Sequence, residues 1–281
     1  MLTGFTIPRA FTGDVARRQL NALRAFRALG IDVIVFGDEE GVGAAAAAEG
    51  ARHVPEIGRT ELGTPLVSDA FAAARELAST PLLLYANADL VFLPGLREAA
   101  ARIGRPRFLG VGRRVDLELD GELSFEPGWD DRLRKEVGRR GELDSPWAID
   151  WFLFPRELDL GLPPFAVGRP GWDNWLIART RSLGLPVVDL TEAVTVVHQR
   201  HGYEHVPGST VRWEEGPEAE ANRSLAAGTE GLGILDATHV LGPRGLRRAL
   251  APRYLRARLV RERRRGSPAG RLLDRVAQLL R

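Results

Sequence analysis

Cysteine is absent from the 281-residue chain. This absence excludes disulfide bonds, cysteine-ligated zinc, iron–sulfur clusters and thiol nucleophiles, so any metal ion must be held by oxygen and imidazole ligands. The sequence has no run of about 20 apolar residues, and its N-terminus lacks the pattern of a secretory signal. We therefore expect a cytoplasmic protein that does not span a membrane.

Several motifs of nucleotide and ester chemistry are also missing. There is no Walker loop, no Gly-x-Gly-x-x-Gly after the first apolar run and no Gly-x-Ser-x-Gly elbow, which argues against an NTPase, a dehydrogenase or a serine hydrolase. Lysine is represented by Lys135 alone, and no Gly-rich, Lys-containing loop is present to cradle a triphosphate.

The charge is unevenly distributed along the chain. The net charge is +2, but residues 244–281 hold thirteen arginines against Glu262 and Asp274, a local charge of +11, which leaves −9 for the rest. An acidic body argues against nucleic-acid binding, whereas the basic tail suits peripheral contact with anionic lipid at the inner face of a membrane. The alternative is a solvated basic helix that packs on its own acidic domain.

Apolar runs alternate with helical patterns over the first hundred residues, which predicts the order βαβαβαβ. The expected strands there are Leu2 to Ile7, Ile31 to Phe36, Ala51 to Val54 and Pro81 to Tyr85, and the expected helices are Asp14 to Gly30, Ala44 to Ala48 and Pro65 to Ala78. Later expected elements are a helix at Leu96 to Ile103, strands at Phe108 to Val111, Ile149 to Phe154, Pro186 to Val188 and Ala193 to Val197, a hairpin around Asp120-Gly121, and a helix starting near Gly171.

These patterns predict an α/β fold with a mostly parallel central sheet flanked by helices, an added antiparallel part and a basic helical C-terminal tail. We expect a catalytic domain over residues 1–205 and a C-terminal extension over residues 206–281.

Asn87-Ala88-Asp89 follows the expected strand Pro81 to Tyr85, at the edge where α/β sheets bind ligands. On an extended chain, residues two apart face the same side, so Asn87 and Asp89 could offer oxygen ligands to one hard cation. The alternative is an ordinary Asn/Asp turn.

Two further clusters carry candidate site residues. Asp173 lies between Trp172 and Trp175 at an expected helix start, and it is either an N-terminal cap or a general base in an aromatic-lined sugar pocket. His198 opens a run that also contains His201, and this run is either a metal site or a polar loop.

Two more positions suit a nucleotide. Arg113 follows the expected strand Phe108 to Val111, where it is either a phosphate-binding guanidinium or part of a surface ion pair. Asp38 follows Phe36-Gly37 at the end of the second expected strand, where α/β folds often set an acid against a ribose or base.

Taken together, these segments resemble the GT-A fold glycosyltransferases, particularly bacterial family-2-like members, over residues 1–205. The resemblance rests on Thr6-Ile7-Pro8 with Gln19 and Asn21, Phe36-Gly37-Asp38-Glu39-Glu40, Glu61 to Leu66, Asn87-Ala88-Asp89, Gly168-Arg169, Trp172-Asp173-Asn174-Trp175, and His198-Gln199.

The resemblance implies metal-dependent transfer of a sugar, with inversion, from a nucleoside-diphosphate sugar to a hydroxyl of a glycan, lipid-linked or small-molecule acceptor. Asp89 stands at the last position of the family's Asp-x-Asp motif and His198 at its C-terminal histidine, so both would bind Mn²⁺ or Mg²⁺. Asp173 stands at the catalytic acidic position. Asn87 replaces the usual first Asp of the motif, and Trp172 replaces the usual Glu before Asp173.

The remaining implied contacts are to the donor: Thr6 and Asp38 to the nucleoside, Asn87 to the metal or the ribose, and Arg113 to the phosphates. Two other functions fit the same layout. One is a nucleotidyltransferase that forms the sugar nucleotide, and the other is a non-catalytic sugar-binding or scaffold protein.

Overall fold

The computed structural model describes residues 1–201, 213–229 and 231–264. Within them the central sheet has the strand order β13-β12-β10-β6-β9-β4-β1-β2-β3. Its strands are β1 (Leu2–Thr6), β2 (Asp32–Phe36), β3 (Arg52–Val54), β4 (Leu82–Ala86), β6 (Leu109–Val111), β9 (Trp151–Pro155), β10 (Val187–Asp189), β12 (His239–Gly242) and β13 (Gly245–Arg248). In this sheet β9 and β13 run against the other described strands, which confirms the expected α/β class with a mostly parallel sheet and an antiparallel part.

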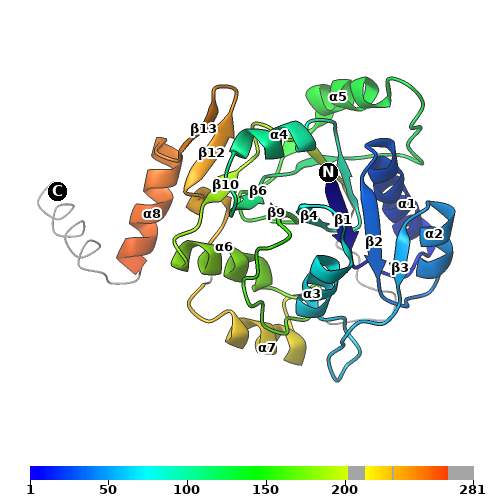
Figure 1. Cartoon of the computed structure of the whole chain (residues 1–281), viewed down its shortest axis with the longest axis horizontal. Helices are drawn as coiled ribbons and strands as arrows, with labels where there is room; N and C mark the ends of the chain where they lie inside the picture. The colour runs from blue at the N-terminus through cyan, green and yellow to red at the C-terminus, as the bar shows by residue number, and fades with distance from the viewer. Residues whose placement is uncertain (202–212, 230, 265–281) are drawn as a thin grey trace, which may run out of the picture.

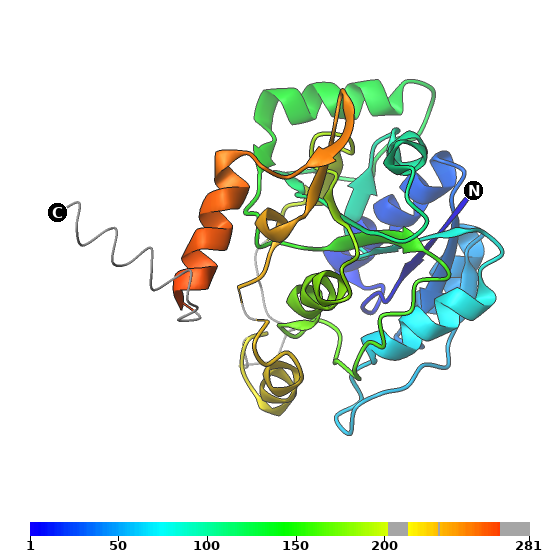
Figure 2. The same ribbon diagram turned by 60° about the vertical axis from the view of Figure 1, so that its left-hand side comes forward.

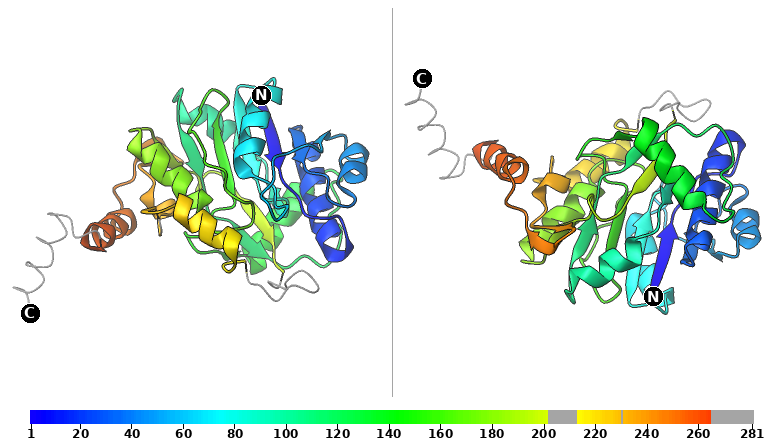
Figure 3. Two further views of the ribbon diagram at one scale, coloured as in Figure 1. Left: turned by 90° about the horizontal axis from the view of Figure 1, so that it is seen from below. Right: turned by 90° about the horizontal axis from the view of Figure 1, so that it is seen from above.

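Helices cover both faces of this sheet (Figure 1). The described helices are α1 (Gly13–Ala28), α2 (Val42–Ala48), α3 (Val67–Leu77), α4 (Leu96–Ile103), α5 (Trp129–Arg140), α6 (Trp172–Ser182), α7 (Pro217–Leu225) and α8 (Pro252–Arg264), with a short 3₁₀ helix at Ile234–Asp236. Apolar side chains of α3 and α6 share one core cluster, and those of α1, α2 and α4 share another. The sheet is therefore the middle layer of three, as the views from below and above also show (Figure 3).

Aromatic packing holds α3 on its face of the sheet. The Phe71 ring lies 5.0 Å from that of Phe5 and 5.3 Å from that of Phe154, which belong to β1 and β9. Burying a side chain of this size contributes about 1.5–3 kcal/mol. Because the N-cap of α3, Leu66, makes no side-chain capping bond, its apolar face and not its cap fixes this helix.

A second, four-stranded sheet in the order β5-β11-β7-β8 lies beside the first. Its strands are β5 (Leu90–Phe92), β11 (Val196–Gln199), β7 (Val115–Leu117) and β8 (Glu142–Leu143). β11 pairs antiparallel with β5 and parallel with β7, so three segments far apart in the sequence become neighbours.

The expected hairpin around Asp120-Gly121 is wrong. Residues 118–125 form no strand, and β7 pairs with β11 and β8 instead. Side chains of α1 satisfy the backbone of this segment: Asn21 bonds the carbonyl of Gly121 and the amide of Leu123, and Arg17 donates to the carbonyl of Leu119. The polar groups that a strand partner would have bonded are thus used in docking the loop on α1.

Smaller differences concern element ends. α1 has Thr12 as its N-cap, and Asp14 lies in the first turn, where its charge favours the helix dipole without capping it. The last expected strand begins at Val196 because residues 190–194 form a turn in which Leu190 accepts from the amides of Ala193 and Val194.

The region after residue 206 contains more regular structure than its polar sequence indicated. α7, β12 and β13 were not expected, whereas the basic helix was, and α8 confirms it within the described residues. β12 and β13 extend the central sheet, so the described part of this region shares that sheet with residues 1–205. The division at residues 205 and 206 stays a prediction. None of the described helices combines the length and the apolar character that crossing a membrane requires.

Candidate active site

The parallel strands β4, β1, β2 and β3 end at one edge of the central sheet, where open α/β sheets bind ligands. Three buried oxygen atoms lie along this edge without a hydrogen-bond partner among the described residues. They are Thr6 Oγ1 at the end of β1, Glu39 Oε2 beyond β2 and Asp89 Oδ1 beyond β4. Because a buried polar atom without a partner is costly, this row indicates a place where a ligand supplies the partners.

Strand pairing in the second sheet brings Asp89 to two histidines. Asp89 directly precedes β5, whose Leu90 is paired with His198 of β11. Asp89 Oδ2 lies 3.4 Å from His198 Nε2 and 3.2 Å from His201 Nε2. One ligand atom from each of the three residues falls within 4.8 Å of the others, so they form a set that can hold a metal ion.

Asp116 fixes the orientation of the His198 ring. It is the residue of β7 paired with His198, and its Oδ1 lies 2.9 Å from His198 Nδ1. A carboxylate behind one ring nitrogen leaves the other nitrogen, Nε2, to face Asp89, which is how metal-binding histidines are commonly held.

The electrostatics of this set favour an ionised Asp89. Burial raises the pKa of Asp89, but hydrogen bonds from His198 and His201 outweigh it and hold that pKa well below its usual range. Burial lowers the pKa of His198, yet the hydrogen bond and charge of Asp89 leave it raised. The site is therefore an anionic carboxylate between two imidazoles, and a cation that binds here competes with the proton that Asp89 favours on His198.

A buried arginine, Arg114, neutralises the carboxylates next to this set. Its Nε lies 2.9 Å from Asp144 Oδ2 and 3.3 Å from Asp116 Oδ1, and its Nη1 lies 2.5 Å from Asp150 Oδ2. The pKa of Asp150 is nevertheless raised, because burial outweighs the lowering effect of the Arg114 charge. The negative charge of Asp89 raises it further. Arg114 thus compensates part of the negative charge that the site collects.

Asn87 does not join the three-ligand set. Its Nδ2 donates to Asp150 Oδ1 at 2.8 Å, and its Oδ1 accepts from the Tyr85 hydroxyl at 3.1 Å. The chain turns after Asn87, whose carbonyl accepts from the amide of Leu90, so Asn87 and Asp89 are not presented together as on an extended strand.

Asp173 lies in the first turn of α6, whose N-cap is Gly171. Burial raises the pKa of Asp173 to about 6, helped by the charge of Asp150 and opposed by backbone N–H bonds. Gly171 occupies the N-cap position, so Asp173 is not the cap of α6. A carboxyl group that titrates near neutral pH suits proton transfer, and the role of general base stays a prediction.

The two tryptophans around Asp173 are packing residues. The Trp172 ring lies 5.0 Å from that of Tyr85, and Trp172 is only 6% exposed. Trp175 packs on Phe165 at 6.1 Å. The indole of Trp172 therefore joins α6 to the sheet, whereas Trp175 is only partly buried. The aromatic-lined sugar pocket stays a prediction.

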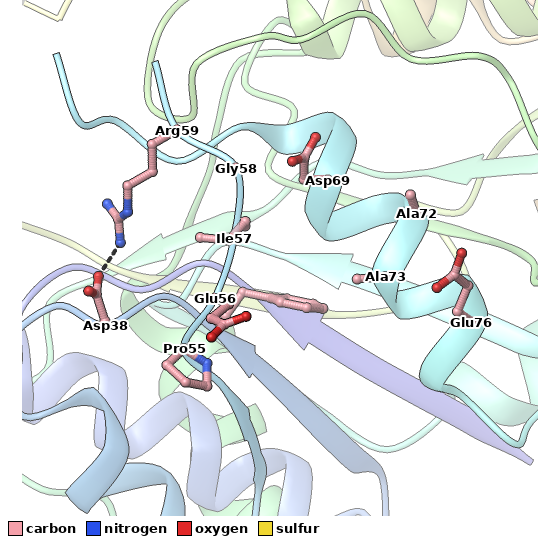
Figure 4. Close-up of a pocket in the computed structure, with 11 residues that line it drawn as sticks. Asp38, Pro55, Glu56, Ile57, Gly58, Arg59, Asp69, Ala72, Ala73 and Glu76 are labelled. Carbon is pink, nitrogen blue, oxygen red and sulfur yellow. Dashed lines mark hydrogen bonds and ion pairs between the residues drawn. The ribbon is translucent and has the colours of Figure 1, made fainter. Parts of the chain in front are cut away.

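A pocket of about 630 Å³ opens beyond the ends of β2 and β3 (Figure 4). Its wall includes Phe36, Asp38, the segment 55–59 and the side of α3 that carries Asp69 and Glu76. Arg59 reaches across from that segment to pair with Asp38, and its Nη1 bonds Glu39 Oε1 at 2.9 Å. The volume is in the range of small-ligand sites.

Asp38 lines this pocket, whereas its neighbour Glu39 is not a lining residue and pairs with Arg59. The Asp38 side chain is 69% exposed, whereas that of Glu39 is 24% exposed and keeps one oxygen without a partner. Arg113 lies elsewhere: its Nε donates to the carbonyl of Asp144 at 2.6 Å, so it holds the chain after β8. Its neighbour Arg114 is the arginine that the structure places among the site carboxylates.

The residues that sequence reasoning missed as site members are Glu39, Arg114, Asp116 and Asp150. Arg114 and Asp116 are two residues apart at the start of a strand, so their side chains lie on the same face of it. The neighbouring sequence does not indicate which face of that strand lies against His198. Asp150 stands directly before the buried strand β9, which runs antiparallel to β4 and therefore starts beside the end of β4. An acidic residue at the start of such a strand was the sequence feature that could have indicated a site residue.

No protein-family model matches the chain, and no curated protein is significantly similar to it in sequence. Among solved structures, the chain is similar to glucosyl-3-phosphoglycerate synthase from Mycobacterium tuberculosis in complex with Mg²⁺ and uridine diphosphate, at 17% identity over 72% of each chain with a TM-score of 0.41. Another structure of that enzyme aligns over 80% of each chain at 17% identity and a TM-score of 0.44. GalNAc-T7 with UDP, GalNAc and Mn²⁺ aligns over 79% of this chain and 47% of that chain, at 14% identity and a TM-score of 0.48. Identities and TM-scores this low do not establish a shared activity.

Proposed function

We propose that this chain is a glycosyltransferase that moves a sugar from a nucleoside-diphosphate sugar to an acceptor hydroxyl with the help of a divalent cation. The observation that carries the proposal is the row of unpartnered buried oxygens, Thr6 Oγ1, Glu39 Oε2 and Asp89 Oδ1. Glu39 follows Asp38, which lines a pocket of nucleoside size, and Asp89 belongs to the three-ligand metal set.

The residues of the set fit a divalent cation. Asp89 Oδ1 is buried and has no partner among the described residues, and one carboxylate with two imidazoles suits Mn²⁺ better than Mg²⁺, which prefers oxygen ligands. Asp89, His198 and His201 would hold the ion, with Asp116 orienting His198. When bound, such an ion supplies Lewis-acid stabilisation of the charge that develops on a leaving diphosphate.

The nucleoside of the donor fits the pocket beyond β2 and β3. Glu39 offers its free oxygen as an acceptor for a ribose hydroxyl or a base N–H group, and Thr6 offers a hydroxyl between that pocket and Asp89. Asp38 lies at the rim and holds Arg59. The diphosphate then reaches Asp89, and the sugar lies beyond it.

Asp173 acts as the base in this proposal. An acceptor hydroxyl is a poor nucleophile, and a carboxylate with a pKa of about 6 can take its proton at neutral pH as the hydroxyl attacks the anomeric carbon. Direct attack by the acceptor, opposite the leaving diphosphate, inverts the configuration of that carbon.

A product assay tests the proposal. The protein is incubated with Mn²⁺, a mixture of acceptors and, one at a time, UDP-, GDP-, ADP- and dTDP-sugars, and glycosylated product and free nucleoside diphosphate are measured. We expect transfer with one donor, lost in Asp89→Ala and kept in Asp14→Ala, a control whose side chain is 78% exposed on α1.

Two outcomes would contradict the proposal. Pyrophosphate release from a sugar phosphate and a nucleoside triphosphate would show a nucleotidyltransferase. Sugar binding with neither turnover nor metal dependence would show a scaffold protein.

A further inference from the structure

The basic helix α8 is fixed to the domain by one of its faces. The Tyr254 hydroxyl is fully buried and donates to Asp189 Oδ2 at 2.6 Å. Arg258 donates to the carbonyl of Ala237 at 2.9 Å, and Arg261 Nε to Asp236 Oδ1 at 2.9 Å. These contacts set the rotation of the helix about its own axis and therefore decide which side chains point away from the domain.

The side of α8 that points away from the domain carries Leu255, Arg256, Leu259 and Val260. Together with Leu250, which lies just before the helix, these residues form a surface that we name the outer face of α8. The four apolar members are between 40% and 62% exposed. They make up four of the eleven exposed large hydrophobic side chains among the described residues, all within residues 250–260. Leu255 and Leu259 are four residues apart, as are Arg256 and Val260, so each pair is adjacent on the helix surface.

The outer face lies at one end of the molecule. α8 stands beyond β13, at the opposite end from β3 and α2, and no other labelled helix or strand lies on its outer side in Figure 1. Figure 2 shows the same helix, in orange, at the edge of the molecule. As far as the described residues are concerned, a flat surface can therefore approach it without contact with the ends of β1, β2 and β4, where the donor is expected.

The charge distribution indicates what that surface is. Residues 244–281 carry +11, whereas the rest of the chain carries −9. Arg256 is exposed, and no hydrogen bond or ion pair ties it to another described residue. Aliphatic side chains flanked by arginine suit the boundary between the headgroups and the acyl chains of an anionic bilayer. The negative surface of such a bilayer also repels the acidic remainder of the chain.

We propose that the outer face of α8 docks on an anionic membrane surface and so orients the protein there. Leu255, Leu259 and Val260 enter the headgroup boundary, and Arg256 meets lipid phosphates. The domain contacts of Tyr254 and Arg261 remain intact, so docking requires no rearrangement of the helix. This proposal does not depend on the glycosyltransferase function.

Vesicle flotation tests the proposal with the full chain. We expect binding to vesicles of phosphatidylcholine with 30% phosphatidylglycerol, on the order of the anionic fraction of natural membranes, and no binding to phosphatidylcholine alone. Arg256→Ser should weaken binding about fivefold, and the double variant Leu255→Ser/Leu259→Ser by about tenfold or more. Leu225→Ser, an apolar residue of α7 with 38% exposure, is the matched control and should bind as the parent chain does.

All variants keep residues 265–281, so differences between them report on the outer face. Their circular dichroism and thermal unfolding must match those of the parent chain, and if the double variant fails this check, Arg256→Ser and Val260→Ser alone decide. Equal binding by the parent and these variants, or equal binding to both vesicle types, would overturn the proposal. Self-association that the same substitutions abolish, without vesicle binding, would assign the outer face to a second copy and also overturn it.

Discussion

Asp173→Asn should make the protein more stable and at the same time nearly inactive. Burial raises the pKa of Asp173 from 3.8 to about 6, so folding of the ionised form at neutral pH carries a penalty. A folded-state pKa above the unfolded value means that the folded chain binds the proton more tightly. Below pH about 4 Asp173 is protonated in both states and carries no folding penalty. The penalty grows, and the protein loses stability, as the pH rises through about 6.

The size of the effect follows from the same values. A shift from 3.8 to about 6 corresponds to at most about 3 kcal/mol at pH 7.5. The Asp173 side chain is not completely buried, so solvent reduces this figure, and we expect about 1–2 kcal/mol. For a chain of this length that is an increase in melting temperature of about 2–3 °C. At pH 4.5 the increase should shrink to about a third.

Thermal unfolding of the parent chain and Asp173→Asn at both pH values measures this difference, and the transfer rate is measured in parallel. Loss of the base should lower turnover about 10²–10⁴-fold, and turnover of the parent chain should fall below pH about 6. The assignment of a buried, proton-binding carboxyl group would be refuted if the variant melted below the parent chain. It would also be refuted if the melting temperature rose by the same amount at both pH values. Unchanged transfer would remove Asp173 as the base.

Three further substitutions test the packing of α7 and two of the unpartnered site oxygens. The side chain of Asn222 bonds the buried amide and carbonyl of Ala166 at 2.9 and 3.0 Å, and Asn222→Ala leaves both groups without a partner. This substitution should lower the free energy of unfolding, measured by urea titration, by about 2–4 kcal/mol. The control Glu220→Ala, on the exposed side of the same helix, should change it by less than about 0.5 kcal/mol. Thr6→Val removes an unpartnered buried oxygen, so the melting temperature of the protein alone should stay equal or rise while nucleotide affinity falls; a lower melting temperature would contradict this. Glu39→Gln should weaken nucleotide binding about tenfold in calorimetry, and unchanged affinity would exclude the free Glu39 oxygen as a contact.

The α/β order was readable from the sequence because each buried strand and its following helix carry their own periodicity. The order βαβαβαβ and the helix at Leu96–Ile103 are confirmed. The position of Asp89 at the end of β4 followed from the same pattern. Its meeting with His198 did not, because it depends on the pairing of β5 with β11 across more than 100 residues.

Long-range side-chain contacts explain the misses. The segment around Asp120-Gly121 has the residues of a tight hairpin, but the amide group of Asn21 replaces the strand partner. Arg113 and Arg114 are equivalent in the sequence, and only the position of Asp150 before β9 shows which of them enters the site. Such choices depend on tertiary packing, which local patterns do not encode.

The most direct test of the central claim is calorimetric titration of UDP, GDP, ADP and dTDP into the protein, with and without Mn²⁺, with Asp89→Ala and His201→Ala as variants. We predict that one nucleotide binds only with Mn²⁺, that Asp89→Ala abolishes this binding and that His201→Ala weakens it, because both residues belong to the three-ligand set. Metal-independent binding, or binding that survives in Asp89→Ala, would contradict a metal site at Asp89 and with it the proposed route of the donor across the sheet edge.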